Sequence, residues 1–156
     1  SHDIHHEVEV VLKINKVGKN IAEKFAHKYY DELTVGIDFT ARDVQSKLKA
    51  KGLPWELAKG FDGSASVGTF VPKSDFSDLS NIDFSLRIND ELKQQGNTGL
   101  MIFSFDKIIS FVSAYFTLKK GDLIFTGTPA GVSAVKVGDE LKCFLDDKNL
   151  LTVNVK

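Results

Sequence analysis

Cysteine is nearly absent from this sequence of 156 residues, and its scarcity excludes two kinds of site. The single cysteine, Cys143, cannot form a disulfide within the chain and cannot supply a CxxC zinc site. It lies between Leu141 and Leu145 in an alternating apolar pattern, which predicts a buried and unreactive thiol. A reducing, cytoplasmic setting fits this composition.

Long hydrophobic runs and an excess of one charge are also missing. No stretch approaches about 18 consecutive apolar residues, and the polar first residues lack the apolar segment of a signal peptide. We therefore expect no membrane partner. The formal net charge of -1 argues against a nucleic-acid surface built on bulk positive charge.

The residues that are present are typical of one globular domain, with 42% hydrophobic and 26% charged side chains. Helical spacing of apolar residues predicts helices over 21–33, from about 41 to 51, and over 106–116. Strand-like patterns cover 7–15, 34–39, 69–71, 82–88, 122–126, 140–145 and 150–155. We predict a single α+β domain over residues 1–156, with mostly antiparallel strands.

Local signals place the ends of these elements. Asn20 and Thr40 are predicted to cap the first two helices, and Gly52 to end the second. Asn89-Asp90 is predicted to form a hairpin turn. Tyr115 and Phe116 are predicted to lie on the buried face of the third helix.

The first strand carries two acidic residues that face the same way. Side chains alternate along a strand, so Glu7 and Glu9 project from one face, about 7 Å apart along the chain. One interpretation is an edge strand with a solvated outer face. The other is that a hard divalent cation, Mg²⁺, Mn²⁺ or Ca²⁺, lies between the two carboxylates.

Further polar residues stand at the ends of apolar strands, and each of them admits a plain structural explanation. Asp38 ends the strand over 34–39 and could be a turn or capping residue. Lys59 precedes a stretch rich in glycine and serine that could bind an anion, or it could be a solvated lysine. Thr128, in a Thr-Gly-Thr-Pro turn, could present its hydroxyl to a carboxylate or simply belong to that turn. Taken singly, these signals indicate only a small α+β domain with a possible carboxylate metal site.

Several blocks together resemble the fumarylacetoacetate hydrolase family. The blocks are Glu7-Val8-Glu9, residues 36–45 (GIDFTARDVQ), residues 51–62 (KGLPWELAKGFD) and residues 123–132 (LIFTGTPAGV). They occur in the order of the family and cover nearly the whole chain. The resemblance is closest to the small acylpyruvate hydrolase and oxaloacetate decarboxylase type, together with bacterial isomerase and decarboxylase relatives in aromatic catabolism.

The resemblance assigns a role to each matching residue. It implies that three carboxylates bind Mg²⁺ (or Mn²⁺, with Ca²⁺ possible), that a lysine beside the metal is catalytic, and that three further residues hold the substrate. The metal ligands would be Glu7, Glu9 and Asp38, and the catalytic lysine would be Lys59. The substrate would be held by Arg42, Gln45 and Thr128. It further implies a mixed β-sheet roll of the type found in the family's C-terminal domain, and a homodimer.

The implied reaction is cleavage of a C–C bond in a small oxo acid such as an acylpyruvate or fumarylpyruvate. The metal would act as a Lewis acid on the enolate, and Lys59 would add positive charge near the developing oxyanion. Decarboxylation of oxaloacetate and isomerisation of 2-hydroxyhepta-2,4-diene-1,7-dioate remain alternatives, because all three reactions use the same metal site.

One feature of the family pattern is not found in this sequence. Small members carry a segment before the E-x-E strand that supplies a His and a Glu to activate water, whereas only residues 1–6 precede Glu7 here. His5 and His6 are expected to support neighbouring residues or to be exposed, rather than to act as that base. We therefore expect an N-terminally incomplete domain, and a non-catalytic metal-binding homologue remains an alternative.

Overall fold

The computed structural model describes residues 1–156 and shows an α+β domain in which every strand pairing is antiparallel. The helices are α1 (Glu23–Ala26), α2 (Arg42–Ala50), α3 (Glu56–Lys59) and α4 (Phe105–Tyr115), with short 3-10 turns η1 (Lys73–Asp75) and η2 (Thr98–Leu100). The strands are β1 (Ile4–His6), β2 (Val8–Ile14), β3 (Tyr30–Asp38), β4 (Thr40–Ala41), β5 (Ala65–Val67), β6 (Val71–Pro72), β7 (Asp83–Ile88), β8 (Glu91–Asn97), β9 (Leu123–Phe125), β10 (Ser133–Ala134), β11 (Glu140–Leu145) and β12 (Lys148–Asn154).

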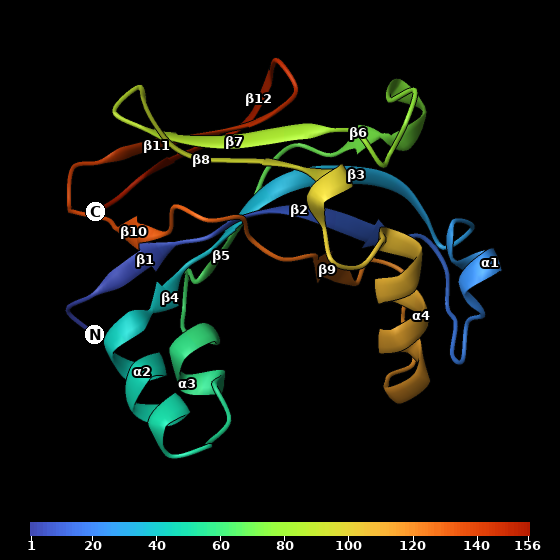
Figure 1. Ribbon diagram of the computed structural model, residues 1–156, viewed down its shortest axis with the longest axis horizontal. Coiled ribbons are helices and arrows are strands. Elements are labelled where there is room, and N and C mark those ends of the chain that lie inside the picture. Colours follow the sequence, from blue (N-terminus) through green and yellow to red (C-terminus); the bar gives the residue numbers. More distant parts are fainter.

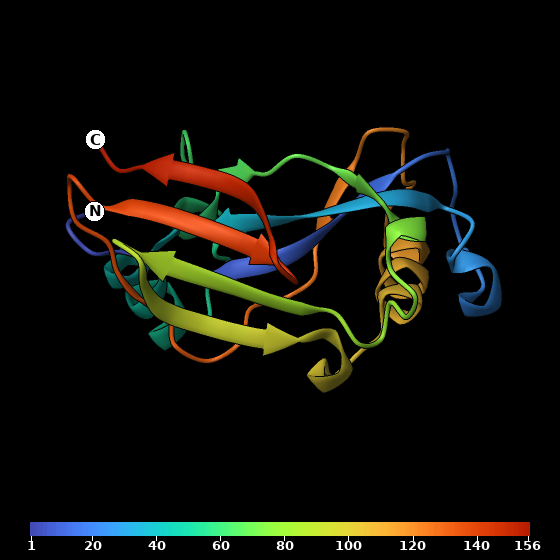
Figure 2. The same cartoon turned by 90° about the horizontal axis from the view of Figure 1, so that it is seen from above.

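Three sheets build the domain. The central sheet has the order β5-β3-β2-β9, with β6 also pairing with β3. A four-stranded sheet, β12-β11-β7-β8, lies over one face of it, and a small sheet, β10-β1-β4, flanks it (Figures 1 and 2). Helices α2 and α3 lie on the other side of the central sheet at one end of the molecule, and α4 lies on that side toward the opposite end (Figure 1). None of these helices has the length and hydrophobicity needed to cross a membrane.

The hydrophobic core lies between the central sheet and the four-stranded sheet. Alternate residues of the long strands enter it: Val8, Val10 and Leu12 of β2; Leu33, Val35 and Ile37 of β3; and Leu141, Cys143 and Leu145 of β11. The burial of Cys143 confirms the prediction from its neighbours. Glu9 of β2 and Asp38 of β3 therefore lie on the opposite face, and so does Glu7, which directly precedes β2.

The predicted helix over 21–33 is wrong. Only Glu23–Ala26 are helical, and β3 begins at Tyr30. Residues of the expected helix instead enter the antiparallel ladder with β2, where Leu33 pairs with Leu12 and both are fully buried. The helical spacing of apolar residues in this stretch is therefore outweighed by a long strand pairing.

Two predicted caps are also wrong. Asn20 takes a left-handed conformation with φ of 52° outside α1. Thr40 belongs to β4, and no side chain caps α2. In contrast, Gly52 ends α2 with φ of 64°, and Asn89 and Asp90 form the hairpin turn with positive φ angles, as predicted.

The third predicted helix is confirmed as α4, but its buried face is narrower than expected. Ser104 caps it by accepting a hydrogen bond from the Lys107 N–H. Tyr115 and Phe116, predicted to be buried, are exposed at the end of the helix. Strand β8 was not predicted, because its sequence is polar; it pairs on one side only, with β7.

Candidate metal centre

Strand geometry brings three carboxylates together on the helix-covered face of the central sheet. Glu7 lies at the break between β1 and β2, and Glu9 is the second residue of β2. Asp38 ends β3, and its N–H donates to the Glu7 carbonyl at 2.9 Å. One carboxylate oxygen from each of the three residues lies within 4.8 Å of the other two. The same-face prediction for Glu7 and Glu9 is therefore confirmed, and Asp38 joins them across the strand pairing.

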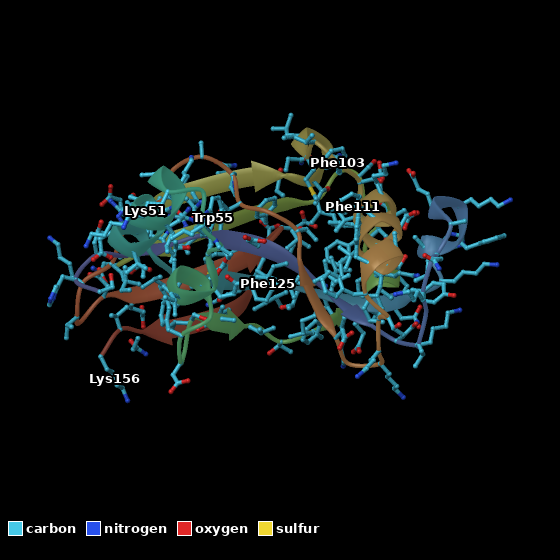
Figure 3. All side chains as sticks on the ribbon, turned by 90° about the horizontal axis from the view of Figure 1, so that it is seen from below. Lys51, Trp55, Phe103, Phe111, Phe125 and Lys156 are labelled. Carbon is cyan, nitrogen blue, oxygen red and sulfur yellow. The ribbon has the colours of Figure 1, made fainter.

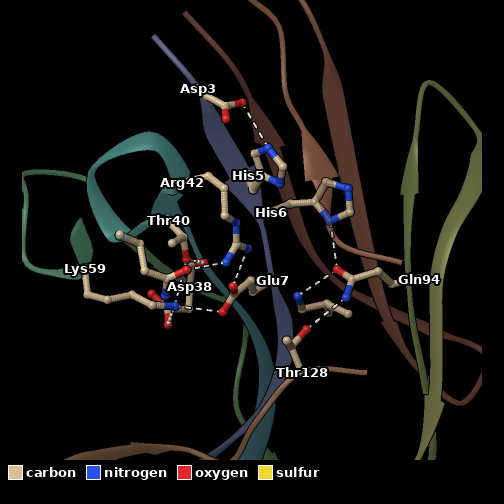
Figure 4. Close-up of polar contacts among 12 residues, drawn as sticks. Asp3, His5, His6, Glu7, Asp38, Thr40, Arg42, Lys59, Gln94 and Thr128 are labelled. Carbon is tan, nitrogen blue, oxygen red and sulfur yellow. Dashed lines mark hydrogen bonds and ion pairs between the residues drawn. The ribbon is translucent and has the colours of Figure 1, made fainter. Parts of the chain in front are cut away.

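Lys59, at the end of the short helix α3, places its ammonium group against this cluster (Figure 4). Its Nζ donates to Asp38 Oδ2 at 2.6 Å, to Glu7 Oε2 at 2.7 Å and to Thr40 Oγ1 at 2.7 Å. Burial lowers the pKa of Lys59, but the bonds to Asp38 and Glu7 outweigh it and hold that pKa above its ordinary value. Lys59 is therefore positively charged at neutral pH and is held in place by these three oxygens.

Arg42 and Gln45 come from the first turn of α2. Arg42 Nη2 donates to Glu7 Oε1 at 2.6 Å, and Nη1 donates to the side-chain oxygen of Gln45 (Figure 4). Burial would raise the pKa of Glu7, but the bonds from Lys59 and Arg42 outweigh it and hold that pKa below its usual value. Glu7 is therefore ionised and already has two cationic partners.

Glu9 has no such partner. Its side chain is 6% exposed, and its one hydrogen bond is accepted from the Gly127 N–H at 2.6 Å. Burial raises the pKa of Glu9 to about 7, and the nearby charges of Asp38 and Glu7 contribute in the same direction. For Asp38, burial also raises the pKa, although the Lys59 bond opposes it.

The uncompensated Glu9 is the observation that tests whether a metal fits here. A buried carboxylate without a cation is unfavourable, and a hard divalent cation held by carboxylate oxygens removes that cost. Arg42 forms an ion pair with Glu7, Lys59 forms ion pairs with Glu7 and Asp38, and neither cation contacts Glu9. The donor set of Glu7, Glu9 and Asp38 therefore fits Mg²⁺, Mn²⁺ or Ca²⁺.

The loop after β9 closes the other side of the centre. Gly127 binds Glu9, and the Thr126 hydroxyl donates to the Val10 carbonyl at 2.8 Å, so the loop is fixed to β2. Thr128, predicted to bind substrate, is the next residue; the hydrogen bond to its hydroxyl comes from Gln94 Nε2, at 2.9 Å (Figure 4).

Sequence reasoning missed the role of two polar residues behind the centre, Thr40 and Gln94. Thr40 accepts from Lys59; Gln94 and His6 are buried, and His6 Nδ1 lies 2.7 Å from Gln94 Oε1. Burial lowers the pKa of His6, against the opposing effect of the Gln94 bond. His5 and His6 are expected from the sequence either to support their neighbours or to be exposed. His6 supports a neighbour, Gln94, and His5 is half-buried beside Asp3. Gln94 gave no signal because it lies in the polar strand that was not predicted.

Known proteins and one family model are similar to this chain over most of its length. The family model described as "Fumarylacetoacetate (FAA) hydrolase C-terminal" matches residues 1–156. A mitochondrial oxaloacetate decarboxylase of Dictyostelium discoideum is 45% identical over 143 residues, covering 92% of this chain and 66% of that protein. An oxaloacetate tautomerase of Escherichia coli is 41% identical over 150 residues, covering 96% of this chain and 68% of that protein.

A solved structure has a very similar fold. The fumarylpyruvate hydrolase of Pseudomonas aeruginosa, in complex with Mn²⁺ and pyruvate, superposes with a TM-score of 0.93 at 35% identity, covering 99% of this chain and 66% of that one. The chain thus spans about two thirds of the length of the curated relatives it matches.

Proposed function

This chain belongs to the fumarylacetoacetate hydrolase family, and from that membership we propose that it acts, with a divalent metal, on a small 2-oxo dicarboxylic acid. Its proposed reaction is the keto–enol tautomerisation of oxaloacetate. The observation that carries the proposal is the cluster of Glu7, Glu9 and Asp38 with the Lys59 ammonium bonded to two of the three. The tautomerase identity of the Escherichia coli relative supports the choice of reaction.

The roles of the residues follow from their charges and contacts. Glu7, Glu9 and Asp38 would hold Mg²⁺ or Mn²⁺, which supplies Lewis-acid stabilisation of negative charge on the oxygens of a 2-oxo acid. Lys59 would add a fixed positive charge beside the 2-oxo oxygen, where negative charge develops during enolisation. Arg42, oriented by Gln45, would keep Glu7 ionised and in place. Thr128 would donate its hydroxyl to a substrate carboxylate.

Of the three reactions, tautomerisation requires the fewest steps from the residues of this chain. Tautomerisation gives the C3 proton to water, takes a proton from water onto the 2-oxo oxygen, and breaks no C–C bond. Decarboxylation instead breaks the C3–C4 bond, releases CO₂ and leaves the enolate of pyruvate, and hydrolysis of an acylpyruvate needs an attacking water in addition. The fumarylpyruvate hydrolase of Pseudomonas aeruginosa supports C–C hydrolysis as the second candidate.

The test follows three reactions side by side with Mg²⁺ or Mn²⁺: decay of enol-oxaloacetate, formation of pyruvate from oxaloacetate, and hydrolysis of fumarylpyruvate. We expect the protein to accelerate the first well beyond a blank containing the same metal, and Glu9→Gln to match that blank. Acceleration of fumarylpyruvate hydrolysis alone would transfer the assignment to the second candidate. Blank rates for all three substrates would contradict the proposed function.

We also propose that two copies of this chain associate through an apolar face beside α4. Its large apolar residues are all exposed: Leu100, Ile102, Phe103, Phe111, Tyr115 and Phe116. Phe103 and Phe111 lie together on the helix-bearing side of the molecule (Figure 3). Contiguous apolar surface of this kind marks an association site. Leu100, Ile102 and Phe103 line a cavity of about 570 Å³ that also touches Thr128, so a second copy would sit close to the centre.

Sedimentation velocity tests this association. We expect the native protein to sediment as a dimer and the double variant Ile102→Ser, Phe111→Ser to sediment as a folded monomer. Val137→Ser is the matched control, because Val137 is 81% exposed outside this face and its replacement should leave the dimer intact. A native protein that sediments as a monomer would rule the association out.

A further inference from the structure

We propose that Gln94 is a positioning residue that makes the Thr128 hydroxyl a hydrogen-bond donor toward the substrate carboxylate. This inference rests on the proposed function and adds to it a residue that lies in β8, on the other side of the loop from Glu9. It concerns binding of the oxo acid and leaves the metal-binding carboxylates unchanged.

The hydrogen bonds of the Gln94 amide are fully used. Oε1 accepts from the Val8 N–H at 3.0 Å and lies 2.7 Å from His6 Nδ1, while Nε2 donates to Thr128 Oγ1 at 2.9 Å and to the Pro129 carbonyl at 3.0 Å. An amide oxygen accepts two hydrogen bonds and an amide nitrogen donates two. The side chain is 1% exposed, so no water competes for these contacts.

The neighbours of Gln94 fix which end of the amide points where. The Val8 N–H can only donate, so the atom facing it is the oxygen; the Pro129 carbonyl can only accept, so the atom facing it is the nitrogen. In the opposite orientation the amide nitrogen would face the Val8 N–H and the amide oxygen would face the Pro129 carbonyl. A buried donor would then face a donor, and a buried acceptor would face an acceptor. His6 must then donate through Nδ1, and its Nε2 accepts from the Ser133 hydroxyl at 2.8 Å.

This orientation decides the role of Thr128. Because Gln94 Nε2 is a donor, the Thr128 oxygen accepts from it, and the hydroxyl hydrogen is free for another partner. The carbonyl of the next residue, Pro129, already accepts from Gln94. The hydroxyl is thus prepared to donate, and the group that a donor suits is a carboxylate.

The packing of the loop shows that this arrangement is rigid. Gly131 has φ of 101°, and a Cβ added there would stand 2.4 Å from the Lys93 carbonyl oxygen of β8. The loop is therefore pressed against β8 on one side, while Gly127 binds Glu9 on the other. Gln94 connects the two sides, so the Thr128 hydroxyl is held at a fixed place relative to the carboxylate cluster.

The variant that separates this role from a merely structural one is Gln94→Glu. It has nearly the same shape, and at a pH high enough to ionise it the new carboxylate can only accept, so the Thr128 hydroxyl would turn toward residue 94 and away from the substrate. We expect KM for the oxo acid to rise about tenfold to a hundredfold, while kcat changes less than about threefold. Asn154→Asp makes the same amide-to-carboxylate change on the exposed end of β12, and we expect native kinetics from it.

Thr128 provides the second pair of variants. Thr128→Val should raise KM like Gln94→Glu, and the double variant should be no worse than either single one, because both act through one hydroxyl. Thr128→Ser keeps the hydroxyl and should restore native KM. A native KM in Thr128→Val would overturn the inference even if Gln94→Glu failed to fold.

A binding measurement keeps this test independent of turnover. Pyruvate binding to the Mn²⁺-loaded protein is followed by paramagnetic broadening of its methyl proton signal. We expect Gln94→Glu and Thr128→Val to weaken pyruvate binding about tenfold or more while their affinity for Mn²⁺ stays native. Native pyruvate affinity in Gln94→Glu would overturn the inference. Absence of turnover in the native protein would instead contradict the proposed function, and the pyruvate measurement would still decide the role of Gln94.

Discussion

Replacing Glu9 by glutamine should stabilise the metal-free protein at pH 8 and abolish the stabilisation that Mg²⁺ or Mn²⁺ provides. Burial raises the pKa of Glu9 from its ordinary value of 4.5 to about 7 in the folded protein. The favourable contribution of Glu9 is therefore complete below pH 4.5 and is lost as the pH rises through 7. The difference between the two pKa values corresponds to about 3 kcal/mol at pH 8. Chemical denaturation of the native protein and of Glu9→Gln, in chelator at pH 5 and pH 8, measures this difference.

Metal reverses the effect, because a divalent cation binds the ionised carboxylate. At a metal concentration about a hundred times Kd, the stabilisation is about 2.7 kcal/mol, which raises Tm by about 5–10 °C for a domain of this size. We expect this rise in the native protein and less than about 2 °C in Glu9→Gln. Glu56→Gln, an exposed glutamate of α3, is the matched control and should respond like the native protein. A metal response in Glu9→Gln equal to that of the native protein would show that Glu9 is not a ligand.

Replacing Lys59 by methionine should lower kcat by about a hundredfold to a thousandfold. The ammonium of Lys59 contacts Glu7, Asp38 and Thr40, so it is held in place before substrate arrives. A fixed charge of this kind stabilises the developing negative charge of the enolate without further rearrangement. The measurement is the initial rate of enol-oxaloacetate decay at saturating Mg²⁺ and substrate.

Two controls separate this effect from loss of the metal. Lys51→Met removes an exposed lysine that follows α2 and should keep native kcat. In Lys59→Met, Glu7 and Asp38 lose a cation that competes for their oxygens, so the affinity for Mn²⁺ should stay native or increase. A Lys59→Met protein that binds Mn²⁺ and keeps more than about a third of native kcat would contradict the role given to Lys59.

The sequence places Glu7 and Glu9 on one face because strand parity is a local property. Glu7 and Glu9 are two residues apart in a strand, so they share a face whatever the strand pairs with. Asp38 ends the next long strand, and antiparallel pairing of Ile37 with Val8 brings it beside Glu7. Asp38, Lys59 and Arg42 could be assigned to the site only through the family resemblance, because their positions depend on which strands pair and on how α2 and α3 return to the sheet.

The features that the sequence does not reveal depend on contacts between distant parts of the chain. Leu33 fits a helical pattern, and the ladder with β2 makes it part of a strand. Thr40 carries a capping pattern, yet it lies in β4 and accepts from Lys59. Gln94 lies 86 positions from Val8, and only the packing of β8 against the loop after β9 makes it part of the site.

The most direct test of the account is the position of Mn²⁺ in crystals of the native protein soaked with the ion, located by its anomalous scattering. We predict one peak in contact with carboxylate oxygens of Glu7, Glu9 and Asp38, and no peak at that place in crystals of Glu9→Gln. An ordered Mn²⁺ elsewhere, with none among these three carboxylates, would contradict the assignment of the cluster as the metal centre.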